Sequence, residues 1–222
     1  MTTTGAATGH DTTGGERPRG LRLPRGARRA QLLSAALEVF SAQGFHAAAM
    51  DEIAERAGVS KPVLYQHFPG KLDLYLALLD QSCDTIIAAS RDALESTHDN
   101  KQRVAATMDA FFAYVSSAEG AFRLVFESDL TNEPDVRERV DRVTHECAAM
   151  ITHVIRDDTG LPEEQSRLLA VSLVGMAQVS ARFWLADGGA ADGRMTREEA
   201  ATLVAGLAWR GIRGYPRTDE HH

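Results

Sequence analysis

Apolar side chains recur at three- and four-residue intervals along most of the chain, and this spacing is typical of amphipathic helices. With glycine and proline taken as stops, the pattern predicts a helix over residues 28–43, two short helices beginning near Met50 and after Ser60, and a long helix over residues 71–95. Five more are expected over residues 100–117, 120–127, 133–155, 162–186 and from about 197 to about 214. No segment alternates with a period of two between turn signals, so the predicted fold class is all-α.

Local signals mark the ends of several of these helices. Gly44 is placed to end the first helix, and Ser60 is the expected N-cap of the third, with Pro62 in its first turn. Asn132 is the expected N-cap of the seventh helix, and the segment Thr196–Glu199 has the pattern of a capping box before the last one. The chain therefore carries start and stop signals that agree with its hydrophobic periodicity.

Ala54, Gly58 and Leu64 have the spacing of a helix-turn-helix unit. Such a unit needs a small residue where its helices cross, a turn residue that tolerates positive φ, and a buried aliphatic side chain in its second helix. The second helix then presents its outward side chains to DNA, where Lys61 can reach a phosphate or a guanine edge and Pro62 a thymine methyl group. The predicted DNA-binding residues are Arg25, Arg28, Ser60, Lys61, Pro62, Tyr65, Gln66, His67 and Lys71.

The net charge of −7 is unevenly distributed. The first 75 residues carry nine Lys and Arg against seven Asp and Glu, whereas residues 76–222 carry 15 against 24. Six arginines between residues 17 and 29 form a basic segment that can follow phosphates or enter a minor groove; the alternative is a solvated basic tail. The acidic remainder repels DNA, so only one end of the molecule attracts it.

These observations divide the chain into four parts. Residues 1–27 are expected to be a disordered N-terminal region with an Arg-rich arm, and residues 28–70 a helix-turn-helix DNA-binding domain. Residues 71–216 form a larger helical body, followed by a tail at residues 217–222.

The sequence also bears on the state of the cysteines, on membrane association and on catalysis. Cys83 and Cys147 lie far apart without metal-ligand neighbours, which favours two buried thiols in a reducing cytosol over a disulfide or a redox switch. No secretory signal is present, and no apolar run reaches the roughly 18 residues of a membrane helix. We therefore expect a cytoplasmic protein without a membrane partner, which is associated with the nucleoid when it is bound to DNA. No phosphate loop, metal-ligand spacing or nucleophile elbow appears, so no catalytic residue, metal or cofactor is predicted.

Residues 28–80 resemble the TetR family of transcription regulators. The resemblance rests on Ala35–Phe45 (AALEVFSAQGF) and on Met50–Tyr75 (MDEIAERAGVSKPVLYQHFPGKLDLY). It implies an all-helical homodimer, with an N-terminal three-helix DNA-binding domain and a six-helix ligand-binding and dimerisation domain. The chain departs from the family at Ala48 and Ala49, where most members have a Thr or Ser that caps the second helix and contacts phosphate.

A second likeness covers most of residues 17–213. The segments Phe122–Glu127, Val174–Met176 and Ala181–Leu185 are similar to the FasR-type group of that family, regulators of fatty-acid synthesis that bind long-chain acyl-CoA. Periodicity alone does not distinguish a filled core from a hollow one. The resemblance implies a cavity for an acyl chain, for which the candidate lining residues are Ile86, Leu94, Met108, Phe111, Phe112, Phe126, Ile151, Leu173 and Met176.

The last two helices are the predicted dimer interface, because small residues on one face permit close approach. The candidate residues are Val171, Val174, Gln178, Arg182, Val204 and Ala208. The alternative for part of this set is packing inside the subunit.

The sequence therefore predicts a DNA-binding regulator that responds to an acyl-CoA or a similar apolar effector. Three alternatives stay open: a TetR-type repressor of an efflux or catabolic operon with another hydrophobic effector, an enzyme built on a helical bundle, and a ligand-binding protein without DNA binding.

Overall fold

The computed structural model describes residues 23–117, 119–126, 130, 132–186 and 195–212, and within these residues all regular structure is helical. The helices are α1 (Arg25–Ala47), α2 (Met50–Arg56), α3 (Lys61–His67), α4 (Lys71–Glu95), α5 (Asn100–Ser117), α6 (Glu119–Phe126), α7 (Pro134–Thr159), α8 (Glu163–Ala186) and α9 (Arg197–Ile212). The all-α prediction is confirmed. Most of the predicted arm, the tail and the end of the last helix near Gly214 lie outside the described residues.

Helix boundaries follow the sequence signals with three corrections. α1 starts at Arg25 rather than residue 28, directly after Pro24. Gly44 does interrupt the helix, with φ 75° and ψ 169°, but a further short turn follows it up to Ala47. α7 is capped at Glu133 instead of Asn132 and continues four residues further than predicted, to Thr159, because the left-handed position that ends it is Gly160 (φ 68°).

The capping box before α9 forms as predicted. The backbone N–H of Thr196 donates to Glu199 Oε2 at 2.8 Å, and the backbone N–H of Glu199 donates to Thr196 Oγ1 at 3.1 Å. Two backbone donors at the start of the helix are thereby satisfied by reciprocal side chains.

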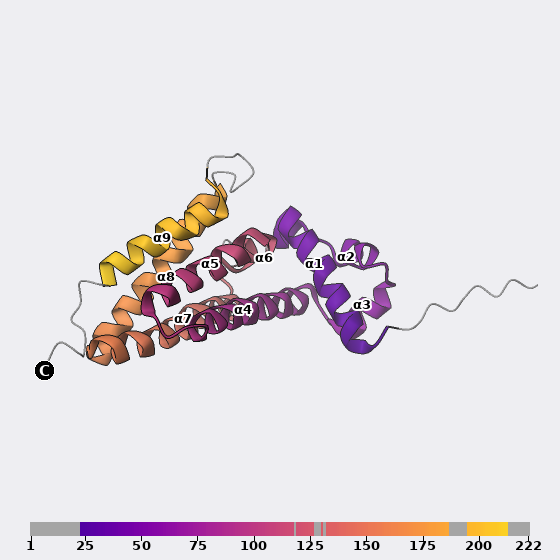
Figure 1. The fold of residues 1–222 in the computed structure, drawn as a ribbon. Helices are drawn as coiled ribbons and strands as arrows, with labels where there is room; N and C mark the ends of the chain where they lie inside the picture. Colours follow the sequence, from indigo (N-terminus) through magenta and orange to yellow (C-terminus); the bar gives the residue numbers. More distant parts are fainter. Residues whose placement is uncertain (1–22, 118, 127–129, 131, 187–194, 213–222) are drawn as a thin grey trace, which may run out of the picture.

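The helices form a small head and a longer body (Figure 1). α1, α2 and α3 gather at one end, and α4 extends from this head along the length of the body. α4 packs against α7 on one side and α5 on the other, while α8 lies against α7 and α9 against α5. α6 is short and packs against both α1 and α4, so it sits where the head meets the body.

One continuous apolar core joins head and body. Leu64 and Leu74 are fully buried in the head and the first turn of α4, and they belong to the same cluster as Phe122 in α6. Between them, the ring of Tyr75 meets Phe40 edge-on at a centroid distance of 5.3 Å and Phe45 at 5.2 Å. A close-packed core transmits displacements because it has little free volume to absorb them.

The two cysteines are free and buried in this core. Burial raises the pKa of the Cys83 thiol to about 12, so the thiol stays protonated at neutral pH. Burial also raises the pKa of Cys147, despite the nearby Ser90 hydroxyl. Both residues therefore act as small packing groups, as expected.

α8 is long and apolar enough to cross a membrane, by length and composition alone. An 18-residue window of it has a mean hydropathy of 1.5, and 33% of that window is buried in the subunit. The expectation that no segment reaches this threshold was wrong. A helix that is apolar on most sides also suits burial between two protein layers, and one face of α8 already packs against α7.

Candidate nucleic-acid interface and internal cavity

α2 and α3 meet as a helix-turn-helix unit requires. Ala54 and Leu64 are 2% and 0% exposed, and Gly58 adopts φ 64°, a value that side-chain-bearing residues rarely take. The turn is closed by backbone bonds from Gly58 N–H to Glu55 O at 2.9 Å and from Val59 N–H to Ala54 O at 3.0 Å. The three residues singled out by spacing thus hold the positions that the motif assigns to them.

The outward face of α3 is the candidate reading surface. Lys61, Pro62, Tyr65 and Gln66 are exposed on it, and Tyr65 is 46% exposed although its ring is large and partly apolar. His67 is half-buried, at the end of the helix. Ser60 occupies the N-cap position, but its side chain makes no capping hydrogen bond. Five predicted DNA-binding residues, 60–62, 65 and 66, therefore form one exposed patch.

Lys61 is held by a weak local contact. Its Nζ lies 2.5 Å from Asp51 Oδ2, and both side chains are 60% exposed. Exposed ion pairs are screened by water and salt and contribute little to stability. Lys61 can therefore exchange Asp51 for a phosphate or a base edge at small cost.

The N-terminal arginines are attached to the head in different ways. Arg25 is exposed in the first turn of α1. Arg28 donates to Gln31 Oε1 at 2.8 Å, and Gln31 donates in turn to the carbonyl of Ala57 at 2.6 Å, next to the turn of the motif. Arg29, which was not among the predicted site residues, lies 4.5 Å above the Phe68 ring. The start of α1 is thereby fixed beside α3.

Lys71, the predicted phosphate clamp, makes its hydrogen bonds within the subunit. Its Nζ donates to the carbonyls of Phe45, His46 and Ala48 at 2.8, 3.1 and 2.9 Å, and it lies 4.6 Å above the Phe45 ring. An ammonium group has three donors, and all three are used here. Lys71 ties the first turn of α4 to the end of α1, which the sequence could not reveal because the partners are backbone atoms more than 20 residues away.

Replacing Lys71 with Met is expected to lower the free energy of unfolding by about 2 kcal/mol, because charge-assisted bonds to three carbonyls are lost. Urea denaturation measures this, with Lys101→Met as the control, since Lys101 is exposed at the start of α5. The dependence of DNA affinity on salt should not change. A stable variant with a shallower salt dependence would restore the phosphate-clamp role.

The absence of a side-chain cap on α2 is confirmed. Ala49 is its N-cap residue, no side chain caps the helix, and Ala48 is buried at 3% exposure. A missing cap costs roughly 1 kcal/mol. The packing of Ala48 and the bond that its carbonyl accepts from Lys71 hold this segment instead.

An internal cavity lies in the body between α4, α5, α7, α8 and α9. The volume that is open to the centres of water-sized spheres is about 100 Å³. The total unfilled space, including the opening to solvent, is about 1000 Å³. Seven of the predicted residues line it: Ile86, Leu94, Met108, Phe111, Phe126, Ile151 and Leu173. The wall is apolar towards Phe111 and Phe126, and carries polar groups such as Asn100 and Asp158 where α5 begins and α7 ends.

Two predicted lining residues lie elsewhere. Phe112 is fully buried and packs edge-on against Trp184 at a centroid distance of 5.9 Å, and it does not line the cavity. Met176 packs beside the cluster around Met108 and Ala205 without lining the cavity. Sequence reasoning missed Thr107 and Trp209, which do line it. Thr107 could have been found, because it lies four residues before Phe111 and so shares its helix face.

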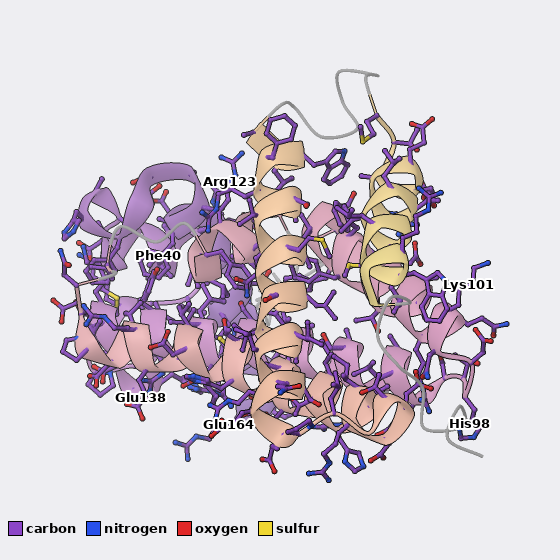
Figure 2. The ribbon with its side chains drawn as sticks, turned by 90° about the vertical axis from the view of Figure 1, so that its left-hand side faces the viewer. Phe40, His98, Lys101, Arg123, Glu138 and Glu164 are labelled. Atoms are coloured by element: carbon purple, nitrogen blue, oxygen red, sulfur yellow. The ribbon has the colours of Figure 1, made fainter. Side chains whose placement is uncertain are left out.

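The predicted dimer interface also needs correction. Val174 and Ala208 are 8% and 3% exposed within one subunit and line the cavity, as does Gln178, which donates to Thr144 Oγ1 at 3.3 Å. Val204 is half-buried, whereas Val171 (37% exposed) and Arg182 do lie on the outer surface. The apolar side chains that remain exposed on α8 and α9 are Leu168, Val171, Val179, Phe183, Leu203 and Leu207. Figure 2 shows α8 in front with α9 beside it, so these helices share one side of the body.

A helix-turn-helix head on a hollow helical body defines a class, the DNA-binding transcription regulators with a separate regulatory domain. Residues 32–78 match the family described as "Bacterial regulatory proteins, tetR family". The HTH-type transcriptional activator FasR of Mycolicibacterium smegmatis is 45% identical over 205 residues, which cover 92% of this chain and 91% of that protein. The chain belongs to the TetR family and is a DNA-binding transcription regulator, not an enzyme.

Solved structures have the same fold. A TetR-like transcriptional regulator from Rhodococcus sp. RHA1 superposes with a TM-score of 0.70 at 27% identity, covering 87% of this chain and all of that one. The regulator FadR from Bacillus subtilis, solved in complex with stearoyl-CoA, superposes with a TM-score of 0.68 over 81% of this chain and 96% of its own. At 17% identity, the likeness to FadR extends to the fold alone.

Proposed function

We propose that this regulator controls genes of fatty-acid synthesis in response to a long-chain acyl-CoA or a similar apolar effector. The observation that carries the proposal is the apolar cavity of the body, seven of whose lining residues were expected from the resemblance to FasR-type proteins. The similarity to FasR extends over the body as well as the head. FadR, which shares the fold, binds stearoyl-CoA. As a DNA-binding regulator the protein would act in the cytoplasm, at the nucleoid.

The chemistry of the cavity suits an acyl chain. Burial of each methylene group is worth about 0.8 kcal/mol, so affinity should rise with chain length until the cavity is filled. The room for a water-sized sphere, about 100 Å³, is well below the roughly 300–1000 Å³ of typical ligand sites. A long chain must therefore displace the walls, and an effector that displaces them binds the two conformations with different affinities.

α6 provides a path from the cavity to the head. Phe126 at the end of α6 lines the cavity, and its ring lies 4.9 Å from that of Phe122. At the other end, a Cβ atom on Gly120 would lie 2.9 Å from Ser41 Cβ of α1, so the two backbones are in close contact. In between, the Tyr75 hydroxyl of α4 donates to the carbonyl of Leu124 at 3.3 Å. A displacement of Phe126 would thus reach both α1 and α4.

Replacing Gly120 with Ala is expected to push α6 away from α1 and destabilise the protein by about 1–3 kcal/mol, the usual range for overpacking. The same variant should bind operator DNA with an altered response to effector. The control is Gly26→Ala, where an added Cβ meets nothing within 4 Å and helix propensity improves. Thermal unfolding and effector titration of a DNA complex measure both effects. A response to effector identical to wild type would exclude the Gly120 contact from the path.

A homodimer is the proposed assembly. Two reading helices must be about 34 Å apart to enter adjacent major grooves of DNA, which a twofold dimer achieves. Among the residues that the structure describes, seven of the ten large exposed hydrophobic side chains lie on α8, on α9 or at Met195 just before α9. Pairing of α8 and α9 with their copies would cover these side chains, and it would account for the apolar composition of α8 without a membrane.

The test of the function is an electrophoretic mobility shift with DNA from upstream of fatty-acid synthesis genes, with and without long-chain acyl-CoA. A salt-sensitive shift that changes with acyl-CoA, and not with free CoA, is expected. Loss of the response to every acyl-CoA tested, with DNA binding intact, would favour a regulator of another operon with a different effector.

Replacing Phe111 with Ala is expected to weaken the response to acyl-CoA about tenfold and to leave operator binding nearly unchanged. Phe111 lines the cavity, and its ring also meets that of Phe122 in α6 at a centroid distance of 6.2 Å. The variant therefore loses a contact with the effector and a contact between α5 and α6. The midpoint of an acyl-CoA titration of the DNA complex measures the change. Lys101→Ala serves as control, because Lys101 is exposed at the start of the same helix as Phe111 and does not line the cavity. An unchanged midpoint for Phe111→Ala would place the effector elsewhere.

A further inference from the structure

Thr107 carries a buried hydroxyl in the cavity wall that has no hydrogen-bond partner among the residues that the structure describes. Three other helical threonines of this protein bond to their own helix. The hydroxyls of Thr85, Thr152 and Thr159 each donate to the carbonyl four residues earlier, at 2.8, 2.6 and 2.7 Å. Thr107 does not make this bond. A buried hydroxyl without a partner costs free energy that a suitable ligand recovers.

Several other polar side chains of the wall already make hydrogen bonds within the subunit. Arg103 donates from Nε to the carbonyls of Leu94 and Thr97 at 3.2 and 2.8 Å, and through a terminal nitrogen to Asn100 Oδ1 at 2.9 Å. These bonds stabilise the loop between α4 and α5, so Arg103 has a structural role. Gln178 donates to Thr144, and the Cys147 thiol lies 3.8 Å from Ser90 Oγ. Within the described wall, the Thr107 hydroxyl is the buried side-chain polar atom that has no hydrogen-bond partner.

Thr107 also lies at the boundary between the two halves of the cavity. Asn100, seven residues earlier and about 10 Å away along α5, belongs to the polar end. Phe111, one turn later, begins the apolar part that continues to Phe126. Figure 2 shows His98, just before α5, and Lys101, in its first turn, on the far side of the body from Phe40 in the head. The apolar end of the cavity therefore points towards the head.

We propose that the Thr107 hydroxyl donates a hydrogen bond to the carbonyl oxygen of an acyl effector, with the alkyl chain directed towards Phe126 and α6. This inference rests on the proposed function and makes it more specific. In an acyl thioester or a fatty acid, the carbonyl oxygen lies where the apolar chain meets the polar head, which matches the position of Thr107. The site then selects acyl compounds over hydrocarbons and ethers of equal length.

The test compares two ligands that differ by one carbonyl oxygen, hexadecanoyl-CoA and its thioether S-hexadecyl-CoA, on wild type and on Thr107→Val. Calorimetry gives the dissociation constants. Wild type is expected to prefer the acyl compound about tenfold, and Thr107→Val to bind both within about twofold, because the variant keeps the shape of threonine without its donor. Thr152→Val is the matched control and should keep the tenfold preference, since its hydroxyl bonds to Ala148 and the residue does not line the cavity.

The outcomes separate this inference from the proposed function. If Thr107→Val retains the tenfold preference while both proteins bind hexadecanoyl-CoA, the role of Thr107 is wrong and the acyl effector stands. If wild type binds neither CoA compound nor free hexadecanoate, both are overturned. Binding of free hexadecanoate identifies the source of the carbonyl. If hexadecanoate binds more tightly than hexadecanoyl-CoA, and Thr107→Val weakens its binding to the same extent, the effector is a free fatty acid and the role of Thr107 is supported.

Discussion

The double variant Phe183→Glu, Leu207→Glu is expected to remain folded, to become monomeric, and to lose operator affinity by about a hundredfold or more. Phe183 on α8 and Leu207 on α9 are 71% and 63% exposed within the subunit, so charges there cause little damage to its own core. In a dimer that pairs these helices, four carboxylates would enter an apolar interface, where unpaired charges are costly. Loss of the second reading head removes the gain from binding two half-sites together, which is typically a hundredfold or more.

Sedimentation equilibrium and operator titration measure the two effects. Leu72→Glu is the control, because Leu72 is an exposed leucine (36%) on α4, outside the proposed interface. It should leave the protein dimeric. A dimeric Phe183→Glu, Leu207→Glu protein with wild-type operator affinity would place the interface on another surface.

The double variant Lys61→Ala, Tyr65→Ala is expected to weaken operator binding by about a thousandfold or more without changing stability or assembly. Each lost contact to DNA typically costs about 1–3 kcal/mol, and in a dimer each is lost in both half-sites. Both side chains are exposed, and the ion pair of Lys61 with Asp51 is screened by solvent, so the folded head loses little.

The salt dependence of the affinity distinguishes phosphate contacts from base contacts. The logarithm of the affinity falls linearly with the logarithm of the salt concentration. If Lys61 binds a phosphate in each subunit, this dependence should be shallower in the variant, with a slope smaller in magnitude by about 1.8. An unchanged slope with relaxed base preference would assign Lys61 to a base edge instead. Lys101→Ala, on the first turn of α5 and far from the head, should change neither quantity. Wild-type affinity in Lys61→Ala, Tyr65→Ala would mean that α3 is not the reading helix.

Part of the molecule could be read directly from the chain because the relevant physics is local. The predicted bounds of α4 and α5 agree with the structure, since their periodicity and their end signals lie within the same few residues. The turn at Gly58 and the capping box at Thr196 are likewise set by neighbours in sequence. The fold class and the class of protein followed from such signals.

Other features depended on which side of a helix meets another helix. Phe111 and Phe112 are adjacent in sequence and equally apolar, yet one lines the cavity and the other packs against Trp184. Val171 and Val174 were both predicted to lie in the dimer interface, but Val174 is 8% exposed and Val171 37%. A helix advances by about 100° per residue, so a small error in its assumed orientation moves a residue from the surface to the core.

The sequence by itself determined an all-α regulator with a helix-turn-helix head, because helix periodicity, caps and the turn glycine act over fewer than ten residues. Only the tertiary structure decided that Lys71 fastens α4 to α1, that Thr107 holds an unpartnered hydroxyl in the cavity wall, and which face of α8 remains exposed. Each of these depends on atoms brought together from distant parts of the chain, and close packing of whole helices, not any local signal, sets their positions.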